Sequence, residues 1–323
     1  MSPGVAGIRA PTALFTHAAC LAHAPGPGHP ESPSRLRAVL DALDDDGFSA
    51  LARFDAPDAT REQLLRVHDA ALVDAVLAPL PLGEQRRLDP DTVQSSGSAE
   101  AALRAAGAAC AAVDAVMAGP VRRAFCAVRP PGHHAARDAA MGFCLFNNVA
   151  VAAAHALAAH GLERIAIIDF DVHHGNGTAD IFRNEPRVLY ASTHQWPLYP
   201  GTGAREDRGE GNLVHVPLPP TAGSSAFRRA FDDEVLPAIE AMRPQLVLVS
   251  AGFDAHRRDP LASLALETED YAWVTARLVE RAERHAGGRL VSTLEGGYDL
   301  TALADSAAAH VAALMATPRG HGP

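Results

Sequence analysis

The chain has 323 residues, 48% of them hydrophobic, which is enough to bury one large domain or two average ones. Its formal net charge of −10 argues against nucleic acid and anionic membrane surfaces as partners, since both favour clustered positive charge. The four cysteines lack Cys-x-x-Cys spacing and no targeting signal is recognisable, so we expect free thiols and a cytoplasmic location.

The hydrophobic pattern predicts short apolar strands that alternate with helices. Strands are expected over residues 12–16, 124–128, 164–170, 188–192, 213–216, 246–250 and 289–294. Helices are expected over residues 34–46, 61–77, 98–117, 147–160, 224–242, 269–284 and 300–315. This alternation is typical of an α/β domain with a central, mostly parallel sheet of about eight strands and helices on both faces.

We expect one domain over residues 1–323, with an ordered core over about 11–316 and a frayed tail from residue 317. The alanine-rich stretch 99–119 contains Glu100, Arg104 and Asp114, which argues against a membrane span.

Polar, chemically active segments follow four of the predicted strands. They are RPPGHHA (129–135), DFDVHHGNG (169–177), SAGFDAHRRDP (250–260) and LEGGYDL (294–300). Ligands bind open parallel sheets at the carboxyl ends of the strands, so we expect these segments to meet at one rim.

Asp171 and His173 are two residues apart in an extended segment and therefore point to the same side. Alone, such a pair also fits ordinary hydrogen-bonded loop residues. Together with Asp254 from a second strand end, it forms an Asp2His set that leaves a coordination position open for water, as a catalytic divalent ion requires.

His133 and His134 fit either a buried core pair or acid–base groups near the metal. Histidine has an unperturbed pKa of about 6.5, which suits proton transfer near neutrality. Asp169 is a candidate partner that orients one imidazole. Tyr298 fits an ordinary aromatic residue at a turn, but the preceding Gly296 and Gly297 allow a close approach, so that its hydroxyl can donate to a developing oxyanion.

These motifs together resemble the histone deacetylase family of the arginase-deacetylase fold, especially its class II and bacterial members, which are related to acetylpolyamine amidohydrolases. Asn176 favours class II, because class I members usually carry Asp there. The resemblance covers nearly the whole chain, in the segments HAACLAHAPGPGHPESPSRL (17–36), LLRVHDAALVDAV (64–76), LDPDTVQSSGSAEAALRAAGA (88–108), RPPGHHA (129–135), MGFCLFNNVAVAA (141–153), IDFDVHHGNGT (168–178), YPGTG (199–203), SAGFDAHRRDPL (250–261) and LEGGY (294–298).

The resemblance implies a role for each matched residue. It implies Zn²⁺ at Asp171, His173 and Asp254, and a structural K⁺ at Asp169, Asp171, His173 and Ser192. His134 would be the general base, His133 with Asp169 would give electrostatic help, and Tyr298 would polarise the acyl carbonyl.

The resemblance also implies a narrow tunnel for the acylated amine. Gly142, Phe143 and Tyr199 would line it, although relatives more often carry Phe where this chain has Tyr199. Leu261 falls at the gatekeeper position, and either Asp89 or Asp91 would hold the substrate at the rim. Arg35 would lie near an internal channel for acetate.

The expected activity is zinc-dependent hydrolysis of an acetylated amine, most of all Nε-acetyl-lysine, to the free amine and acetate. Acetylated polyamines or other small acylated amines are the alternative substrates, and the sequence does not distinguish zinc from iron. An arginase-like binuclear manganese ureohydrolase and a non-catalytic acyl-amine-binding module are further alternatives. The substrate is the one expected partner, and a homo-oligomer is left open.

Overall fold

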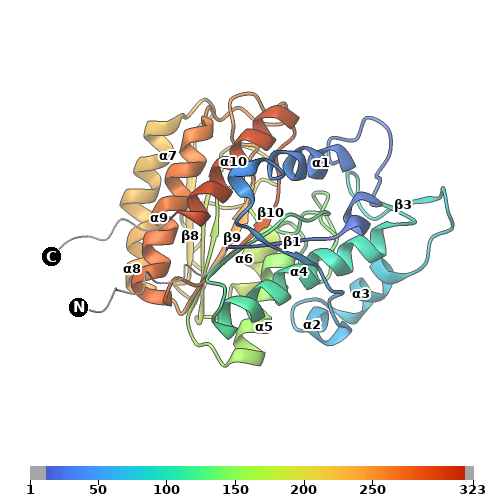
Figure 1. The fold of residues 1–323 in the computed structure, drawn as a ribbon, viewed down its shortest axis with the longest axis horizontal. Helices are drawn as coiled ribbons and strands as arrows, with labels where there is room; N and C mark the ends of the chain where they lie inside the picture. Colours follow the sequence, from blue (N-terminus) through green and yellow to red (C-terminus); the bar gives the residue numbers. More distant parts are fainter. Residues whose placement is uncertain (1–11, 317–323) are drawn as a thin grey trace, which may run out of the picture.

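The computed structural model describes residues 12–316, and its centre is one parallel sheet of eight strands (Figure 1). The strand order is β2-β1-β5-β10-β9-β6-β7-β8. The bounds are β1 Thr12–Thr16, β2 Ala52–Asp55, β5 Arg123–Cys126, β6 Ile165–Asp169, β7 Val188–Gln195, β8 Leu213–Leu218, β9 Leu246–Ala251 and β10 Leu290–Leu294. A separate antiparallel pair joins β3 Gln85–Arg87 and β4 Val93–Ser95. The predicted single α/β domain is confirmed.

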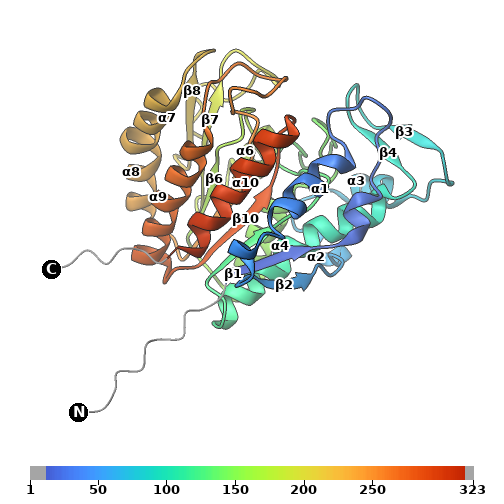
Figure 2. The ribbon, with the colours of Figure 1, turned by 45° about the horizontal axis from the view of Figure 1, so that its top comes forward.

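Helices cover both faces of the sheet (Figures 1 and 2). Helices α1, α7, α8, α9 and α10 pack on one face, and α4, α5 and α6 on the other. The helical bounds are η1 Ala18–Leu21, α1 Pro33–Ala42, η2 Asp46–Phe48, α2 Arg61–Leu65, α3 Ala70–Leu77, α4 Ser98–Ala118, α5 Asn148–His160, α6 Asn176–Phe182, α7 Ser224–Ala230, the π-helical turn η3 Phe231–Val235, α8 Leu236–Met242, α9 Thr268–Ala286 and α10 Leu300–Met315.

The sheet order brings the four polar segments together. Strands β5, β10, β9 and β6 are consecutive neighbours, and all their residues are buried. Their apolar side chains pack against helices on both sides, which explains why the strands lack an alternating polar pattern. The segments that follow them therefore leave the sheet at one edge, as predicted.

Several predicted elements need correction. The expected helix over 61–77 is two helices, because His68 turns inward at the break and accepts a hydrogen bond from the Asn147 backbone N–H at 2.9 Å. Strand β2 escaped prediction because it is a short edge strand with three exposed residues. Helix α6 was not predicted; its first two residues, Asn176 and Gly177, belong to the polar motif DFDVHHGNG itself. The helix over 224–242 contains the π-helical turn η3. The predicted frayed tail lies outside the described residues.

Helix α4 is the one helix among residues 12–316 that is long and apolar enough to cross a membrane. However, 61% of its most apolar window is buried inside the fold, as in a core helix. Its charged residues are paired at the surface: Arg104 with Asp58 at 2.9 Å, and Asp114 with two histidines of α5. The four cysteines are buried free thiols, as predicted.

A buried ionic group ties the proline-rich loop before α1 to the end of β5. Both carboxylate oxygens of Glu31 accept hydrogen bonds from Arg129, at 2.5 and 2.6 Å, and both side chains are fully buried. Arg35 and His23 also contact this carboxylate. Burial alone would raise the pKa of the Glu31 carboxyl, but the charge of Arg129 and the contact with His23 hold it well below its usual range.

Replacing Arg129 with Met is expected to lower the free energy of unfolding by about 3–5 kcal/mol, because it removes the main partner of a buried carboxylate. Urea denaturation measures the change. The control Arg61→Met removes an exposed ion pair with Asp74 and should cost less than about 1 kcal/mol. Small and equal losses in the two variants would contradict the structural role of Arg129.

Candidate metal centre and active site

Asp171, His173 and Asp254 come together at the ends of β6 and β9. All three are buried, and their ligand atoms lie within 4.8 Å of one another. The Nδ1 atom of His173 lies 3.1 Å from an oxygen of Asp171 and 3.2 Å from an oxygen of Asp254. The set of three ligands predicted from the sequence is therefore assembled in the structure.

The surroundings of this cluster suit a cation. Burial alone would lower the pKa of His173, but the hydrogen bonds and charges of Asp171 and Asp254 raise it to about 10, so the local field favours positive charge. Two glycines make room for the carboxylates. A Cβ atom added at Gly252 would lie 2.0 Å from Oδ2 of Asp171, and one at Gly296 would lie 2.0 Å from Oδ2 of Asp254. Two carboxylates and one imidazole form a donor set that fits a divalent metal ion.

A second cluster of side chains that could bind a metal joins α4 and α5. One oxygen of Asp114 lies 2.7 Å from Nε2 of His155 and 2.7 Å from Nε2 of His160. The Nδ1 atom of His155 faces the Arg66 guanidinium at 3.1 Å, and a guanidinium only donates hydrogen bonds. Nδ1 must then accept, so Nε2 carries the proton and donates it to Asp114. His155 therefore has no free lone pair at Nε2 to bind a metal. We interpret this cluster as a network of hydrogen bonds.

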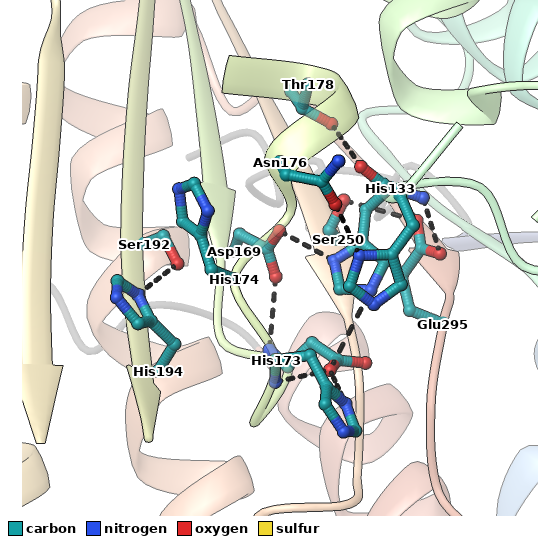
Figure 3. Close-up of polar contacts among 12 residues, drawn as sticks. His133, Asp169, His173, His174, Asn176, Thr178, Ser192, His194, Ser250 and Glu295 are labelled. Atoms are coloured by element: carbon teal, nitrogen blue, oxygen red, sulfur yellow. Dashed lines mark hydrogen bonds and ion pairs between the residues drawn. The ribbon is translucent and has the colours of Figure 1, made fainter. Parts of the chain in front are cut away.

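His133 lies between the carboxylates of Asp169 and Asp171. Figure 3 shows its contact with Asp169. Its Nδ1 is 3.0 Å from Oδ2 of Asp169, which also accepts a hydrogen bond from the Tyr190 hydroxyl at 2.9 Å. Burial would lower the pKa of His133, but the charges of Asp171 and Asp169 outweigh it and raise the pKa well above its ordinary value. The predicted pairing of His133 with Asp169 is thus present, and it favours the protonated imidazole.

His134 has a different environment. Its Nδ1 donates to the side-chain oxygen of Asn176 at 2.8 Å, while the Asn176 amide donates to the Met141 sulfur at 3.3 Å. Burial and the neighbouring charges of His133 and His173 hold the pKa of His134 well below its ordinary value. The ring is therefore neutral, and its one proton is on Nδ1, where Asn176 accepts the hydrogen bond. Nε2 is then unprotonated and is able to accept a proton.

Tyr298 follows the two glycines after β10. The Arg35 guanidinium carbon lies 4.8 Å from the centre of its ring, and its backbone N–H donates to Oδ2 of Asp259 at 2.8 Å. Arg35 is fully buried and donates to the backbone carbonyls of Gly297 and Glu295, both at 2.5 Å. The predicted acetate-channel residue therefore supports the loop that carries Tyr298.

Phe143 and Tyr199 form aromatic walls beside the metal cluster. The Phe143 ring contacts the Tyr298 ring at a centroid distance of 5.9 Å, and the Tyr199 ring contacts the His134 ring at 5.2 Å. Phe143 has φ = +69°, a left-handed conformation that is strained for a residue with a side chain. Gly142 permits the close packing here, since a Cβ atom there would lie 2.4 Å from the His134 ring.

The two acids predicted at the rim, Asp89 and Asp91, make different contacts. Asp89 accepts the backbone N–H groups of Asp91 and Thr92, at 2.8 and 2.9 Å, so it stabilises its own turn. Asp91 instead accepts the Gly142 N–H at 3.2 Å, next to Phe143 in the chain. Leu261 is 36% exposed, and its backbone N–H donates to Asp259.

The residues expected to hold K⁺ are neighbours. Asp169 on β6 pairs with Ser192 on β7, and both side chains are buried. Asp169 also accepts the Asp171 backbone N–H at 3.1 Å, which places the segment that carries Asp171 and His173 beside it.

Two buried acids were missed by the sequence reasoning, although both lie in motifs quoted there. Glu295 accepts the backbone N–H groups of Gly132 and His133, at 2.6 and 3.1 Å, and burial raises its pKa to about 7. Asp259 accepts two backbone N–H groups in the Tyr298 region. No spacing rule marks such residues, because both partners of Glu295 and the Tyr298 partner of Asp259 are backbone groups distant in sequence.

The alternative of a binuclear manganese site requires ligands for a second metal ion beside the first. Among residues 12–316, the clustered ligands at this site are only Asp171, His173 and Asp254. His256, the residue that kept this alternative open, accepts the Arg258 backbone N–H at 3.2 Å and is not one of the clustered ligands.

The histone deacetylase domain model matches residues 29–314. A histone deacetylase-like amidohydrolase of Pseudomonas aeruginosa is 44% identical over 310 residues, which cover 89% of this chain and 81% of that protein. A probable deacetylase of Archaeoglobus fulgidus is 41% identical over 296 residues, which cover 90% and 82%.

A solved structure of an HDA15 HD domain superimposes with a TM-score of 0.89 at 38% sequence identity, covering 94% of this chain and 88% of that one. The sheet, the clustered ligands and these relatives agree. The chain is a hydrolase of amides and belongs to the histone deacetylase family.

Proposed function

We propose that this chain is a zinc-dependent deacetylase that hydrolyses Nε-acetyl-lysine to lysine and acetate. The observation that carries the proposal is the buried cluster of Asp171, His173 and Asp254 beside two histidines in opposite environments. Asp171, His173 and Asp254 would hold Zn²⁺, and Asp169, Asp171, His173 and Ser192 would hold K⁺. When bound, the divalent ion supplies a Lewis acid to the acyl oxygen and to the attacking water.

The side chains divide the remaining work. His134 takes a proton at Nε2 from the water that attacks the acyl carbon, and Tyr298 donates its hydroxyl proton in a hydrogen bond to the acyl oxygen. His133, held by Asp169, stabilises the negative charge that develops. The C–N bond then breaks, a histidine gives its proton to the leaving amine, and acetate remains.

Acetyl-lysine is the favoured substrate because Leu261, at the gatekeeper position, brings no acid to meet a distal ammonium group. Phe143 and Tyr199 offer an aromatic passage suited to an aliphatic stem, with one added hydroxyl from Tyr199. Asp91, beside Gly142, is the rim acid placed to accept a substrate N–H. An acetylated polyamine is the alternative, in which Asp91 meets a distal amine. Cytoplasmic location, the lack of nucleic-acid or membrane partners and a homo-oligomer stay predictions.

Acetate release from an acetyl-lysine peptide and from an N-acetylated polyamine, measured side by side with zinc-loaded protein, tests the proposal. We expect a higher kcat/KM for the peptide. A higher kcat/KM for the polyamine would overturn the substrate assignment, and no acetate from either would overturn deacetylation and favour a binding module.

Asp254→Asn should abolish tight zinc binding, because it replaces a charged ligand with a neutral one. The loss in affinity should exceed the roughly 10–100-fold that follows loss of an outer hydrogen-bond partner. Equilibrium dialysis should give one zinc per chain in the unaltered protein. Asp114→Asn, in the second cluster, is the matched control and should keep one zinc per chain. Loss of zinc in the control would contradict the assignment of the site.

Tyr298→Phe should reduce kcat by about 10²–10³-fold, because it removes one hydrogen-bond donor to the developing oxyanion. Steady-state kinetics on the acetyl-lysine peptide, with zinc content checked in parallel, measures the effect. Unchanged turnover in the zinc-loaded variant would rule out the role given to Tyr298.

A further inference from the structure

The carboxylate of Asp259 connects two loops at the mouth of the site. One oxygen accepts the Leu261 backbone N–H at 3.0 Å, and the other accepts the Tyr298 backbone N–H at 2.8 Å. The side chain is buried, with 8% of the residue exposed. Within residues 12–316 it forms no ion pair, so both oxygens serve backbone groups.

The loop that carries Tyr298 is anchored at three places. The Gly296 N–H donates to Oδ2 of Asp171 at 2.8 Å, and Arg35 holds the Gly297 carbonyl at 2.5 Å. Asp259 supplies the third anchor, at Tyr298 itself. The Gly297 carbonyl and the Tyr298 N–H belong to one planar peptide unit, so Arg35 and Asp259 hold its two opposite ends and together fix how the chain enters Tyr298. Gly297 has φ = +127°, a conformation that glycine adopts readily, so local backbone preference alone does not fix this peptide unit.

A carboxylate is the group that this position requires. Two N–H groups from different loops converge on two oxygens, and a neutral amide of the same shape offers only one acceptor. Burial and the nearby charge of Asp254 raise the pKa of Asp259. Keeping Asp259 ionised therefore has an electrostatic cost, which an apolar residue of the same size would avoid.

We propose that Asp259 is a positioning residue that holds the Tyr298 hydroxyl in place for the reaction and fixes Leu261 at the tunnel mouth. This inference rests on the proposed deacetylase function. Asp259 acts only through these two residues. Misplacing a reacting group by about 1 Å can cost about 10²-fold in rate, so the two hydrogen bonds are sufficient to matter for kcat.

A double-mutant cycle tests the proposal on the zinc-loaded full chain with the acetyl-lysine peptide. Asp259→Ala should lower kcat by about tenfold or more in the unaltered background. In the Tyr298→Phe background it should change kcat by less than about twofold, because the hydroxyl it positions is gone. Any rise in KM that acts through Leu261 should persist in both backgrounds.

Asp259→Asn is the second variant, since it keeps the size of the side chain and one of the two acceptors. Its kcat is expected to lie between that of the unaltered protein and that of Asp259→Ala. This variant takes the place of Asp259→Ala in the cycle if the alanine variant fails to fold.

Arg258→Ala is the matched control, because it breaks the more exposed ion pair with Asp299 between the same two loops, at 3.1 Å. It should leave kcat within about twofold of the unaltered protein, since exposed ion pairs contribute little.

The readouts separate the two proposals. Losses that multiply across the cycle, or an unchanged kcat in both Asp259 variants, would overturn the positioning role while leaving deacetylation intact. An unaltered, zinc-loaded protein that releases no acetate would instead overturn the proposed function itself. Zinc content and thermal melting of each variant distinguish lost positioning from lost metal or lost fold.

Discussion

The active site depends on negative charge buried at the carboxyl ends of neighbouring parallel strands. Asp169, Asp171 and Asp254 are all buried there, and Asp171 and Asp254 both contact the Nδ1 atom of His173. Burying like charges together is costly unless a cation and hydrogen bonds compensate them. The apolar strands β6 and β9 fix the carboxylates in register, and Gly252 and Gly296 leave them room. We therefore regard the sheet as a rigid frame that holds a candidate cation site in place.

The same frame makes two adjacent histidines chemically different. His133 contacts the Asp169 carboxylate, whereas His134 contacts the neutral amide of Asn176. An acid stabilises the protonated imidazole, and an amide oxygen fixes a neutral tautomer with a free lone pair. Asp169 thus favours the protonated form of His133, whereas burial and the neighbouring charges keep the pKa of His134 low and Asn176 accepts a hydrogen bond from its Nδ1.

The sequence was sufficient to predict the fold and the clustering of Asp171, His173 and Asp254, because both follow from the pattern of apolar strands and the polar segments after them. Apolar strands that alternate with helices indicate a parallel sheet, and Asp171 and His173 share a side through their spacing. The contacts of Glu295 with Gly132 and of Asp259 with Tyr298 were not predictable, since they join backbone groups distant in sequence. The choice between Asp89 and Asp91 also required the structure, because only the fold places Gly142 beside one of them.

Diffraction at the zinc absorption edge, from crystals grown with zinc, tests the central claim most directly. We expect a single anomalous peak per chain, within bonding distance of Asp171, His173 and Asp254. Two bridged peaks in this pocket, or a peak only at the Asp114 cluster, would contradict it.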